Sequence, residues 1–297
     1  MEPAEPGANI GVLGATSFVG ATLLDKLKSA QLQVFAYTRR QIHPPVNNVT
    51  WRRLDSELPL SQKLNVDVAV PNWICLIPIG VLSRYFNLLE AHGVRRLVVL
   101  STTSRFTKMT SPDQKEQKLV RNITEAEERL QAWAESRGVE WIILRPTLIY
   151  GGGQDRNIAE ITRFIRRFGF FPVFGKACGL RQPIHVQDVA GACLATLRSC
   201  TPANRAYNIS GAETLTYREM VTRIFKLLDK QPLMIPIPLW MFRTAVFVLR
   251  RLPRYSKWSS AMAERMNADM IFDHSEVRRD FEFQPRTFNL SIDDLPG

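Results

Sequence analysis

The sequence is poor in the features that mark zinc-binding, disulfide-rich and membrane-spanning proteins. Its four cysteines stand far apart and lack the close pairing of a zinc site or a disulfide framework: Cys75, Cys178, Cys193 and Cys200. We find no uninterrupted apolar span of 18 or more residues, and the short acidic start at residues 1–6 is unlike a signal peptide. We therefore expect a cytoplasmic protein with reduced thiols and no metal site.

Acidic residues are also in the minority. There are 28 Asp and Glu against 39 Lys and Arg, which gives a formal net charge of +11 at pH 7. Such an excess indicates an anionic partner, namely a phosphorylated substrate, an acidic membrane surface or nucleic acid. The basic residues are dispersed in local pairs, and no basic run is interleaved with aromatic residues, so we expect no nucleic acid partner. With 45% hydrophobic residues, the 297-residue chain can bury one large core or two smaller ones.

A glycine-punctuated stretch near the N-terminus organises the rest of the chain. Residues 10–13 are typical of a buried strand, and helical apolar spacing begins at Phe18. Gly14 allows a tight turn, and Gly20 allows the helix to pack closely on the strand. A helix N-terminus that follows a strand in this way suits the pyrophosphate of a dinucleotide. Ser17 stands where such motifs usually have a glycine, which leaves open a strand-to-helix turn without a ligand.

Apolar strand-like runs alternate with helical segments through the first half of the chain. We expect strands at residues 10–13, 33–37, 49–52, 73–76, 96–100 and 141–144, and helices at 18–29, 81–91 and 113–137. This alternation predicts an α/β fold with a parallel, doubly wound sheet, whose ligand lies beyond the carboxyl ends of the strands. We assign residues 1–150 to a dinucleotide-binding core, with 183–210 returning to it, and residues 151–297 mainly to a smaller substrate-binding lobe.

Three motifs occur in an order that resembles a known family, at residues 14–20, 144–151 and 183–190. The chain is similar to the extended short-chain dehydrogenases, in the branch of nucleotide-sugar epimerases, dehydratases and keto-sugar reductases. Residues 281–286 also resemble the closing segment of that branch. The resemblance implies a Rossmann-like sheet that binds NAD or NADP and a C-terminal lobe that closes over a nucleotide-diphosphate sugar. A homodimer is compatible with this resemblance.

The resemblance further implies which residues contact the cofactor. The glycine motif would meet the pyrophosphate, and Leu76 with Ile77 would line the ribose side. Asp55 would face the adenine, unless it is a solvated loop acid, and Pro146 would back the nicotinamide. The complete set of predicted cofactor residues is Gly14, Thr16, Ser17, Phe18, Val19, Gly20, Arg39, Arg40, Asp55, Leu76, Ile77 and Pro146.

The end of the second expected strand indicates the choice of cofactor. An acidic residue about 20 positions beyond the glycine motif would bind the ribose 2′-hydroxyl of NAD. Arg39 and Arg40 stand there instead. A guanidinium suits the 2′-phosphate of NADP, and it has no acceptor for a hydroxyl. The sequence therefore favours NADP(H) over NAD(H), with a pair of solvated arginines as the alternative.

The proton-transfer pair of the family is missing from the helix that should carry it. Family chemistry uses a Ser or Thr after the fifth strand, a Tyr, and four residues later a Lys that lowers the pKa of the Tyr. Ser101 and Thr103 provide hydroxyls after that strand, but no tyrosine occurs between residues 85 and 150. In the aligned helix, Leu119 and Ile123 stand in the Tyr and Lys places.

Three interpretations stay open. In the first, which is our working hypothesis, the chain is an NAD(P)-dependent epimerase or keto-sugar reductase in which Ser101 and Thr103 act with a substitute acid. Lys108 is selected for that acid, with Lys115 and Lys118 as alternatives. In the second, the chain is an NADP(H)-binding scaffold or redox-sensing subunit without turnover, as in the atypical branch that includes an accessory subunit of respiratory complex I. In the third, groups of the substrate and cofactor do the acid work themselves.

An apolar stretch with a basic end lies in the second half of the chain. Residues 239–252 predict an apolar helix, and Arg254 and Lys257 extend its basic cluster through residue 258. This helix would attach to an anionic membrane surface, form a lid in which Arg265 or Arg254 pairs with a diphosphate, or pack on the second lobe. We favour packing on the lobe over peripheral membrane contact.

Overall fold

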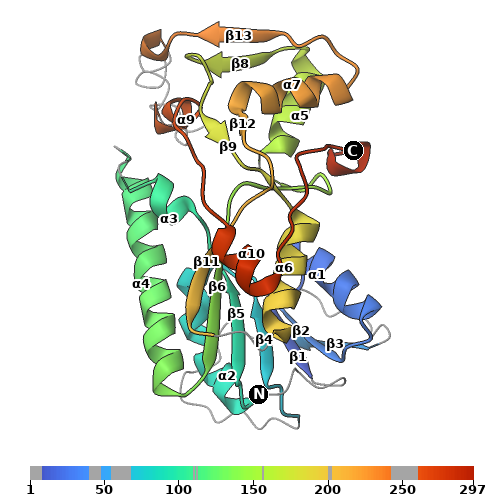
Figure 1. The fold of residues 1–297 in the computed structure, drawn as a ribbon, viewed down its shortest axis with the longest axis vertical. Coiled ribbons are helices and arrows are strands. Elements are labelled where there is room, and N and C mark those ends of the chain that lie inside the picture. The colour runs from blue at the N-terminus through green and yellow to red at the C-terminus, as the bar shows by residue number, and fades with distance from the viewer. Residues whose placement is uncertain are drawn as a thin grey trace.

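The computed structural model describes residues 9–39, 48–54, 68–109, 111, 113–155, 157–199, 203–241 and 260–297. A parallel seven-stranded sheet forms one half of the molecule, and a smaller lobe sits over the carboxyl ends of its strands (Figure 1). The strand order β11–β6–β5–β4–β1–β2–β3 confirms the predicted α/β, Rossmann-like, doubly wound fold. The strands are β1 (Ile10–Leu13), β2 (Val34–Thr38), β3 (Val49–Arg53), β4 (Asn72–Cys75), β5 (Arg96–Leu100), β6 (Glu140–Pro146) and β11 (Arg205–Ile209).

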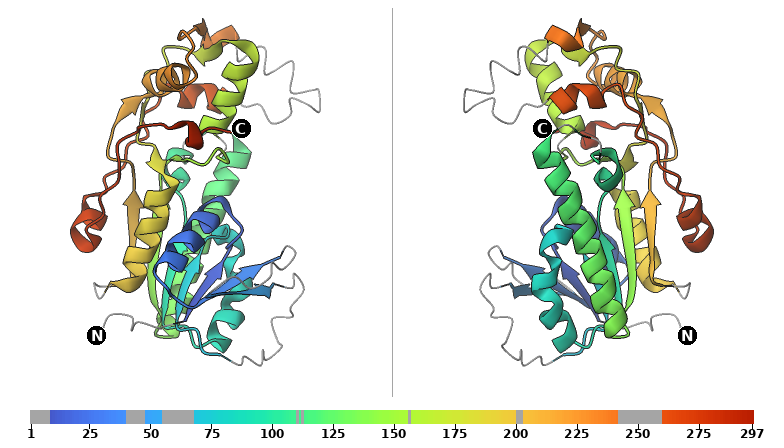
Figure 2. Two further views of the ribbon diagram at one scale, coloured as in Figure 1. Left: turned by 90° about the vertical axis from the view of Figure 1, so that its right-hand side faces the viewer. Right: turned by 90° about the vertical axis from the view of Figure 1, so that its left-hand side faces the viewer.

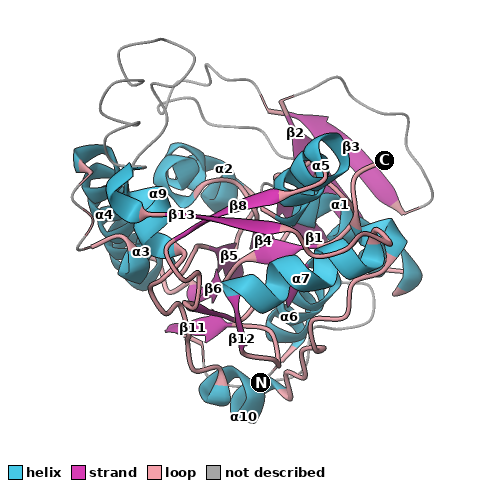
Figure 3. Cartoon of the chain, turned by 90° about the horizontal axis from the view of Figure 1, so that it is seen from above, coloured by secondary structure: helices cyan, strands magenta, loops and turns pink. Residues whose placement is uncertain are grey.

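Helices cover both faces of the sheet, as a parallel sheet requires. One face carries α1 (Phe18–Ser29) and α6 (Val186–Arg198), and the other carries η1 (Ile79–Tyr85), α2 (Phe86–Ala91) and α4 (Gln114–Ser136). Figure 3 shows α4 and α6 on opposite sides of the strands. Successive strand residues pack on alternate faces of the sheet. Val98 packs toward α1 and α6, whereas Val99 packs toward α4.

The segment predicted as a helix over residues 81–91 is a 3₁₀-helix followed by one short α-helix. The 3₁₀-helix η1 brings residues three apart onto one face, and the buried pair Ile79 and Leu82 has this spacing. The other long helix of this face agrees closely with its prediction, because Asp113 caps α4 through the N–H of Lys115.

The lobe has a hydrophobic core of its own, centred on α5 and α7, whose residues Ile165 and Phe225 are fully buried. Its elements are α5 (Ile158–Phe168), β8 (Phe171–Phe174), β9 (Leu180–Arg181), β12 (Leu215–Thr216), α7 (Tyr217–Leu227), β13 (Met234–Ile237) and α9 (Ser260–Arg265). The short elements that connect lobe and sheet are α3 (Ser104–Thr107), β7 (Ile149–Tyr150), β10 (Ile184–His185), α10 (Ser275–Phe281) and η3 (Ile292–Asp294).

The end of the chain returns from the lobe to the sheet. Val277 and Phe281 of α10, with Phe283, join the core beneath α6, and the side views show α10 on the outside of that face (Figure 2). The chain therefore passes between the sheet and the lobe several times, and these passages connect the two parts. No helix in the described ranges is both long enough and apolar enough to cross a membrane.

Candidate functional site

The predicted glycine motif forms the turn between β1 and α1. Gly14 has a φ of +86°, in the left-handed region that favours glycine, and lies against the backbone of Leu76 and Ile77. A Cβ on Gly20 would stand 2.3 Å from the Gly14 carbonyl oxygen, so only glycine lets α1 begin this close to β1. Ser17 caps α1, and its hydroxyl accepts a hydrogen bond from the Gly20 N–H at 3.1 Å. The first turn of α1 has no acidic residue, so its N-terminus is suited to an anion.

Other predicted cofactor residues gather at the same edge of the sheet. Leu76 and Ile77 follow β4, and the Leu76 N–H donates to the Leu13 carbonyl of β1 at 2.8 Å. Pro146 ends β6, and its carbonyl accepts from the Thr103 N–H at 3.1 Å. The remaining residues around the turn are half-buried or buried: Thr16, Ser17, Phe18 and Val19.

The outer strands of this edge carry basic residues and no acid. Arg39 is exposed and directly follows β2. Residues 34–39 and 48–54, which include β2 and β3, contain no Asp or Glu. Two predicted contacts, Arg40 and Asp55, lie outside the described residues.

The three predicted catalytic residues have different surroundings. The Ser101 hydroxyl donates to the Glu127 carboxylate at 2.6 Å, on the α4 side of the strand end. Thr103 is buried, and its hydroxyl donates to a main-chain carbonyl at the end of β6 at 3.0 Å. Lys108 follows α3, with its Nζ 3.8 Å from the Glu116 carboxylate. Thr103 and Lys108 line the cleft between sheet and lobe. Ser101 does not line it, and its hydroxyl is hydrogen-bonded to Glu127.

The places of the family Tyr and Lys hold side chains that cannot transfer a proton. Leu119 on α4 is 42% exposed, and Ile123 is buried in the core between α4 and the sheet. The cleft does contain one tyrosine, Tyr217 at the start of α7, which the sequence analysis did not select. Burial raises the pKa of Tyr217 to about 12, so its hydroxyl stays protonated at neutral pH.

The buried carboxylate of Glu127 joins the loop after β5, α3 and β6 beside this site, and it was not predicted from the sequence. Glu127 on α4 is fully buried and accepts from Ser101, from Arg105 of α3, and from Arg145 of β6 at 2.6 and 3.1 Å. Burial raises the pKa of Glu127, but hydrogen bonds from Arg145 and Ser101 outweigh it and hold that pKa below its usual value. The sequence feature that could have identified Glu127 is its position four residues after Ile123, on the apolar face of α4.

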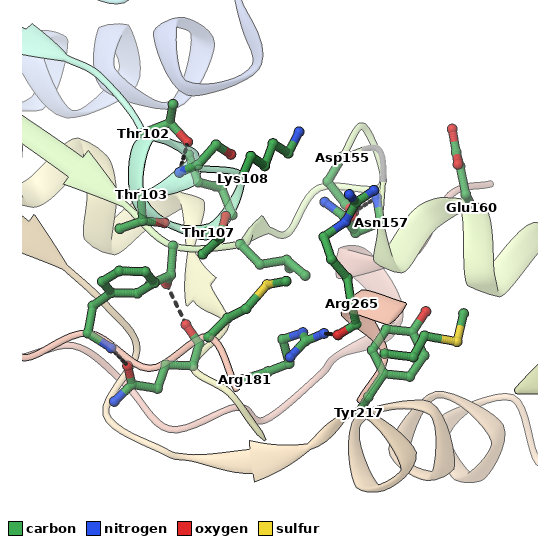
Figure 4. A pocket seen from close by; sticks show the side chains of 18 of the residues that line it. Thr102, Thr103, Thr107, Lys108, Asp155, Asn157, Glu160, Arg181, Tyr217 and Arg265 are labelled. Atoms are coloured by element: carbon green, nitrogen blue, oxygen red, sulfur yellow. Dashed lines mark hydrogen bonds between the residues drawn. The ribbon is translucent and has the colours of Figure 1, made fainter. Parts of the chain in front are cut away.

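A cleft of about 660 Å³ separates the end of the sheet from the lobe (Figure 4). Its sheet side includes Phe18, which follows the glycine turn, and Thr102, whose hydroxyl accepts from the Ser104 N–H at 3.1 Å. Its lobe side includes Arg181 and Tyr217, with the guanidinium 5.6 Å from the ring centre. Arg181 is buried and donates to main-chain carbonyls, among them that of Ala268 at 2.8 Å, so it shapes this wall.

An ion-pair network joins α4 to the lobe beside Lys108. Arg265 of α9 donates twice to the Glu116 carboxylate of α4, at 2.6 and 2.8 Å. Ser111 donates to the same carboxylate at 2.7 Å, and Lys108 approaches it at 3.8 Å. Arg265, which was predicted as a partner for a diphosphate within a lid, therefore binds a carboxylate of the chain itself. The rest of the predicted apolar-basic helix, from residue 242 to 258, lies outside the described residues.

The histidine at the start of α6 has a structural role. His185 caps α6, because its Nδ1 accepts from the Gln187 N–H, and its Nε2 lies 2.9 Å from Asp294 near the end of the chain. Burial raises the pKa of Asp294, but hydrogen bonds from His185 and Ser291 outweigh it and hold that pKa at about 2. Within the described residues, no group of three His, Cys, Asp or Glu is arranged to hold a metal ion.

Parts of the sequence are similar to known proteins. Residues 80–210 match the family model "NAD dependent epimerase/dehydratase family". A UDP-glucose 4-epimerase of Vibrio cholerae is 26% identical over 120 residues, which cover 40% of this chain and 37% of that protein. The mitochondrial NADH dehydrogenase [ubiquinone] 1 alpha subcomplex subunit 9 of Arabidopsis thaliana is 27% identical over 100 residues, covering 33% of this chain and 25% of that protein. The chain thus matches well under two thirds of the length of either relative.

Similarity to solved structures extends over almost the whole chain. The structure of MoeE5 in complex with UDP-glucuronic acid and NAD has a TM-score of 0.67 at 19% sequence identity, and the match covers 97% of this chain and 96% of that one. At this identity the likeness supports the fold. Together with the matched family model, it confirms the resemblance that the motifs predicted, to the NAD-dependent epimerase/dehydratase family of extended short-chain dehydrogenases.

Proposed function

We propose that the chain binds a nicotinamide dinucleotide along the carboxyl edge of its sheet and takes a nucleotide-diphosphate sugar, or a related carbonyl substrate, in the adjoining cleft. The observation that carries this proposal is the turn at Gly20, which is too tight for any side chain and begins α1, with no acidic residue in its first turn, directly after β1. The cleft begins at Phe18 of that turn and reaches Arg265 in the lobe, and its volume suits a small-molecule ligand.

The reaction we propose is epimerisation or reduction at a sugar carbonyl. The dinucleotide, when bound, would supply the hydride chemistry. The chain must then hold the substrate and give a proton to its oxygen. The hydroxyl protons of Ser101 and Thr103 are already donated to chain acceptors, so we assign these two residues to positioning the loop after β5. Lys108 lines the cleft and has an amine that can donate a proton, and we assign it the role of acid.

We further propose that the cofactor is NADP(H). Arg39 is exposed at the end of β2, where the ribose of the adenosine half would lie, and no acid of β2 or β3 competes for a ribose hydroxyl. A guanidinium at that point suits the charge and geometry of a 2′-phosphate.

Calorimetric titration of the purified protein with NADP⁺ and NAD⁺ tests the cofactor proposal. We expect tighter binding of NADP⁺, and Arg39→Ala should weaken it by about tenfold or more while NAD⁺ binding stays unchanged. Arg163→Ala is the matched control, because Arg163 is an exposed arginine on α5, away from β2. A preference for NAD⁺ that Arg39→Ala leaves unaltered would contradict the NADP(H) assignment.

Oxidation of NADPH with a panel of keto-sugar nucleotides tests turnover. Lys108→Met should lower kcat about 100-fold or more without changing the affinity for NADP⁺, as expected for the loss of a general acid. Lys230→Met is the control, because Lys230 is an exposed lysine that does not line the cleft. Equal rates for the two variants would remove Lys108 from the mechanism.

A second candidate function is an NADP(H)-binding scaffold or redox-sensing subunit without turnover. The hydrocarbon side chains of Leu119 and Ile123 favour it, since they replace the proton-transfer pair. The match to an NADH dehydrogenase subunit of Arabidopsis thaliana is compatible with it. Tight binding of NADP⁺, no NADPH oxidation across the panel and no effect of Lys108→Met would favour the scaffold over the enzyme.

A further inference from the structure

The far end of the lobe exposes a concentration of large apolar side chains. We call the set Phe168, Leu233, Ile235, Trp240 and Met241 the lobe-tip patch. Their exposed fractions are 50%, 56%, 42%, 69% and 44%, and they make up half of the ten large hydrophobic residues that the described chain leaves exposed. Single exposed hydrophobic residues are ordinary, but such a concentration at one end of a molecule marks an interaction surface.

Two paired chain segments carry the lobe-tip patch. Strand β13 runs parallel to β8, and the Phe171 N–H donates to the Leu233 carbonyl at 2.9 Å. Phe168 reaches this junction through its ring contacts with Phe164 at 4.6 Å and Phe170 at 6.2 Å. Trp240 follows at the other end of β13, and Figure 1 shows β8 and β13 side by side along the tip of the lobe.

Basic residues outnumber acidic ones in the segments that carry the lobe-tip patch. The segments 158–171 and 226–241, which contain the patch, carry five basic and two acidic residues. The Arg167 guanidinium lies 5.2 Å from the ring centre of Phe168, and Lys226 and Lys230 are exposed at the end of α7. An apolar centre with a basic margin has the chemistry of a surface that inserts into the headgroup region of an anionic bilayer.

The position of the patch leaves the cleft accessible. Helix α5 begins at the cleft, where Glu160 lines the wall, and ends at Phe168 in the patch. Its 11 residues span about 16 Å at 1.5 Å per residue. The cleft and the patch are therefore at opposite ends of the same helix, and contact at one does not obstruct the other.

We propose that the lobe-tip patch docks the protein onto an anionic lipid surface. Charge complementarity selects this occupant over a second copy of the chain, because two copies meeting at this patch would bring like-charged basic margins together. Trp240 and Leu233 would lie at headgroup depth, where tryptophan is favoured, and Arg167 would meet lipid phosphates. The proposal does not depend on turnover, since it uses no residue of the cleft.

Co-sedimentation of the full chain with vesicles tests this proposal. We expect binding to phosphatidylcholine vesicles that contain phosphatidylglycerol, little binding to phosphatidylcholine alone, and release of the protein at high salt. The double substitution Leu233→Ser with Trp240→Ser should lower the partition coefficient about tenfold. Its matched control is Ile271→Ser with Ile292→Ser, because these two residues are exposed to similar extents (47% and 59%) outside the patch.

The charge contribution is tested separately. Arg167→Gln should weaken vesicle binding about fivefold, as expected for one basic residue near an anionic surface, and Arg129→Gln on the exposed side of α4 should not. The proposal is overturned if the unsubstituted protein stays in the supernatant with anionic vesicles, or if the patch and control variants bind equally. It is also overturned if sedimentation velocity without lipid shows a dimer that the patch variant alone loses, because the patch is then a self-association surface.

Discussion

The buried carboxylate of Glu127 offers a sharp test of how the sheet end is built. Glu127→Gln keeps the size of the side chain but removes the negative charge that Arg105 and Arg145 share. Breaking a buried ion pair from one side costs about 3–5 kcal/mol. The two arginines retain 23% and 13% exposure and can recover some hydration. We therefore expect the free energy of unfolding to fall by about 2–4 kcal/mol.

Urea denaturation at neutral pH measures this loss. Glu128→Gln is the control, because Glu128 is the exposed neighbour on α4, and its variant should stay within about 0.5 kcal/mol of the unsubstituted protein. The pKa of Glu127 is lower in the folded than in the unfolded chain. Its carboxylate therefore stabilises the fold above the unfolded pKa, and this contribution disappears as pH falls through the folded pKa. A loss below about 1 kcal/mol, or a difference between protein and variant that does not shrink in acid, would refute the reasoning.

Three further outcomes follow from the same contacts. Gly20→Ala should abolish measurable dinucleotide binding in calorimetry and destabilise the fold by about 2 kcal/mol or more, whereas Gly191→Ala on α6, where a Cβ meets nothing within 4 Å, should be neutral or stabilising. Glu116→Gln should raise the affinity for inorganic pyrophosphate about fivefold by releasing Arg265, and unchanged affinity would show that the two do not compete. Asp294→Asn should flatten the loss of thermal stability between about pH 4 and pH 2, because the folded pKa of about 2 lies below the unfolded value and stability is lost as pH falls between them.

The strands and the glycine turn could be predicted because their signals are local. The run at residues 10–13 is apolar throughout and entirely buried, and Gly20 follows it at the spacing that a strand-to-helix turn requires. Helix α4 could be predicted equally well, since its apolar residues recur at helical spacing after the cap at Asp113. These features depend on neighbours within a few residues.

The polar organisation of the site could not be predicted, because it joins residues far apart in the chain. Glu116 and Arg265 are 149 positions apart, and His185 meets Asp294 across 109. The hydrogen bond from Ser101 to Glu127 likewise depends on how α4 packs on β5. Sequence spacing gave the hydroxyl after the strand but could not show that its proton is already donated.

The electrostatics of the cleft give a reason to expect an anionic ligand there, whether or not the chain turns it over. At the corner beside the sheet, Lys108 and Arg265 share the single carboxylate of Glu116. A second carboxylate, Asp155, caps α5 by accepting from main-chain N–H groups there and is buried. Glu160 lines another part of the cleft, but at this corner two cations share one carboxylate, and a diphosphate would offer them more acceptor oxygens than Glu116 does.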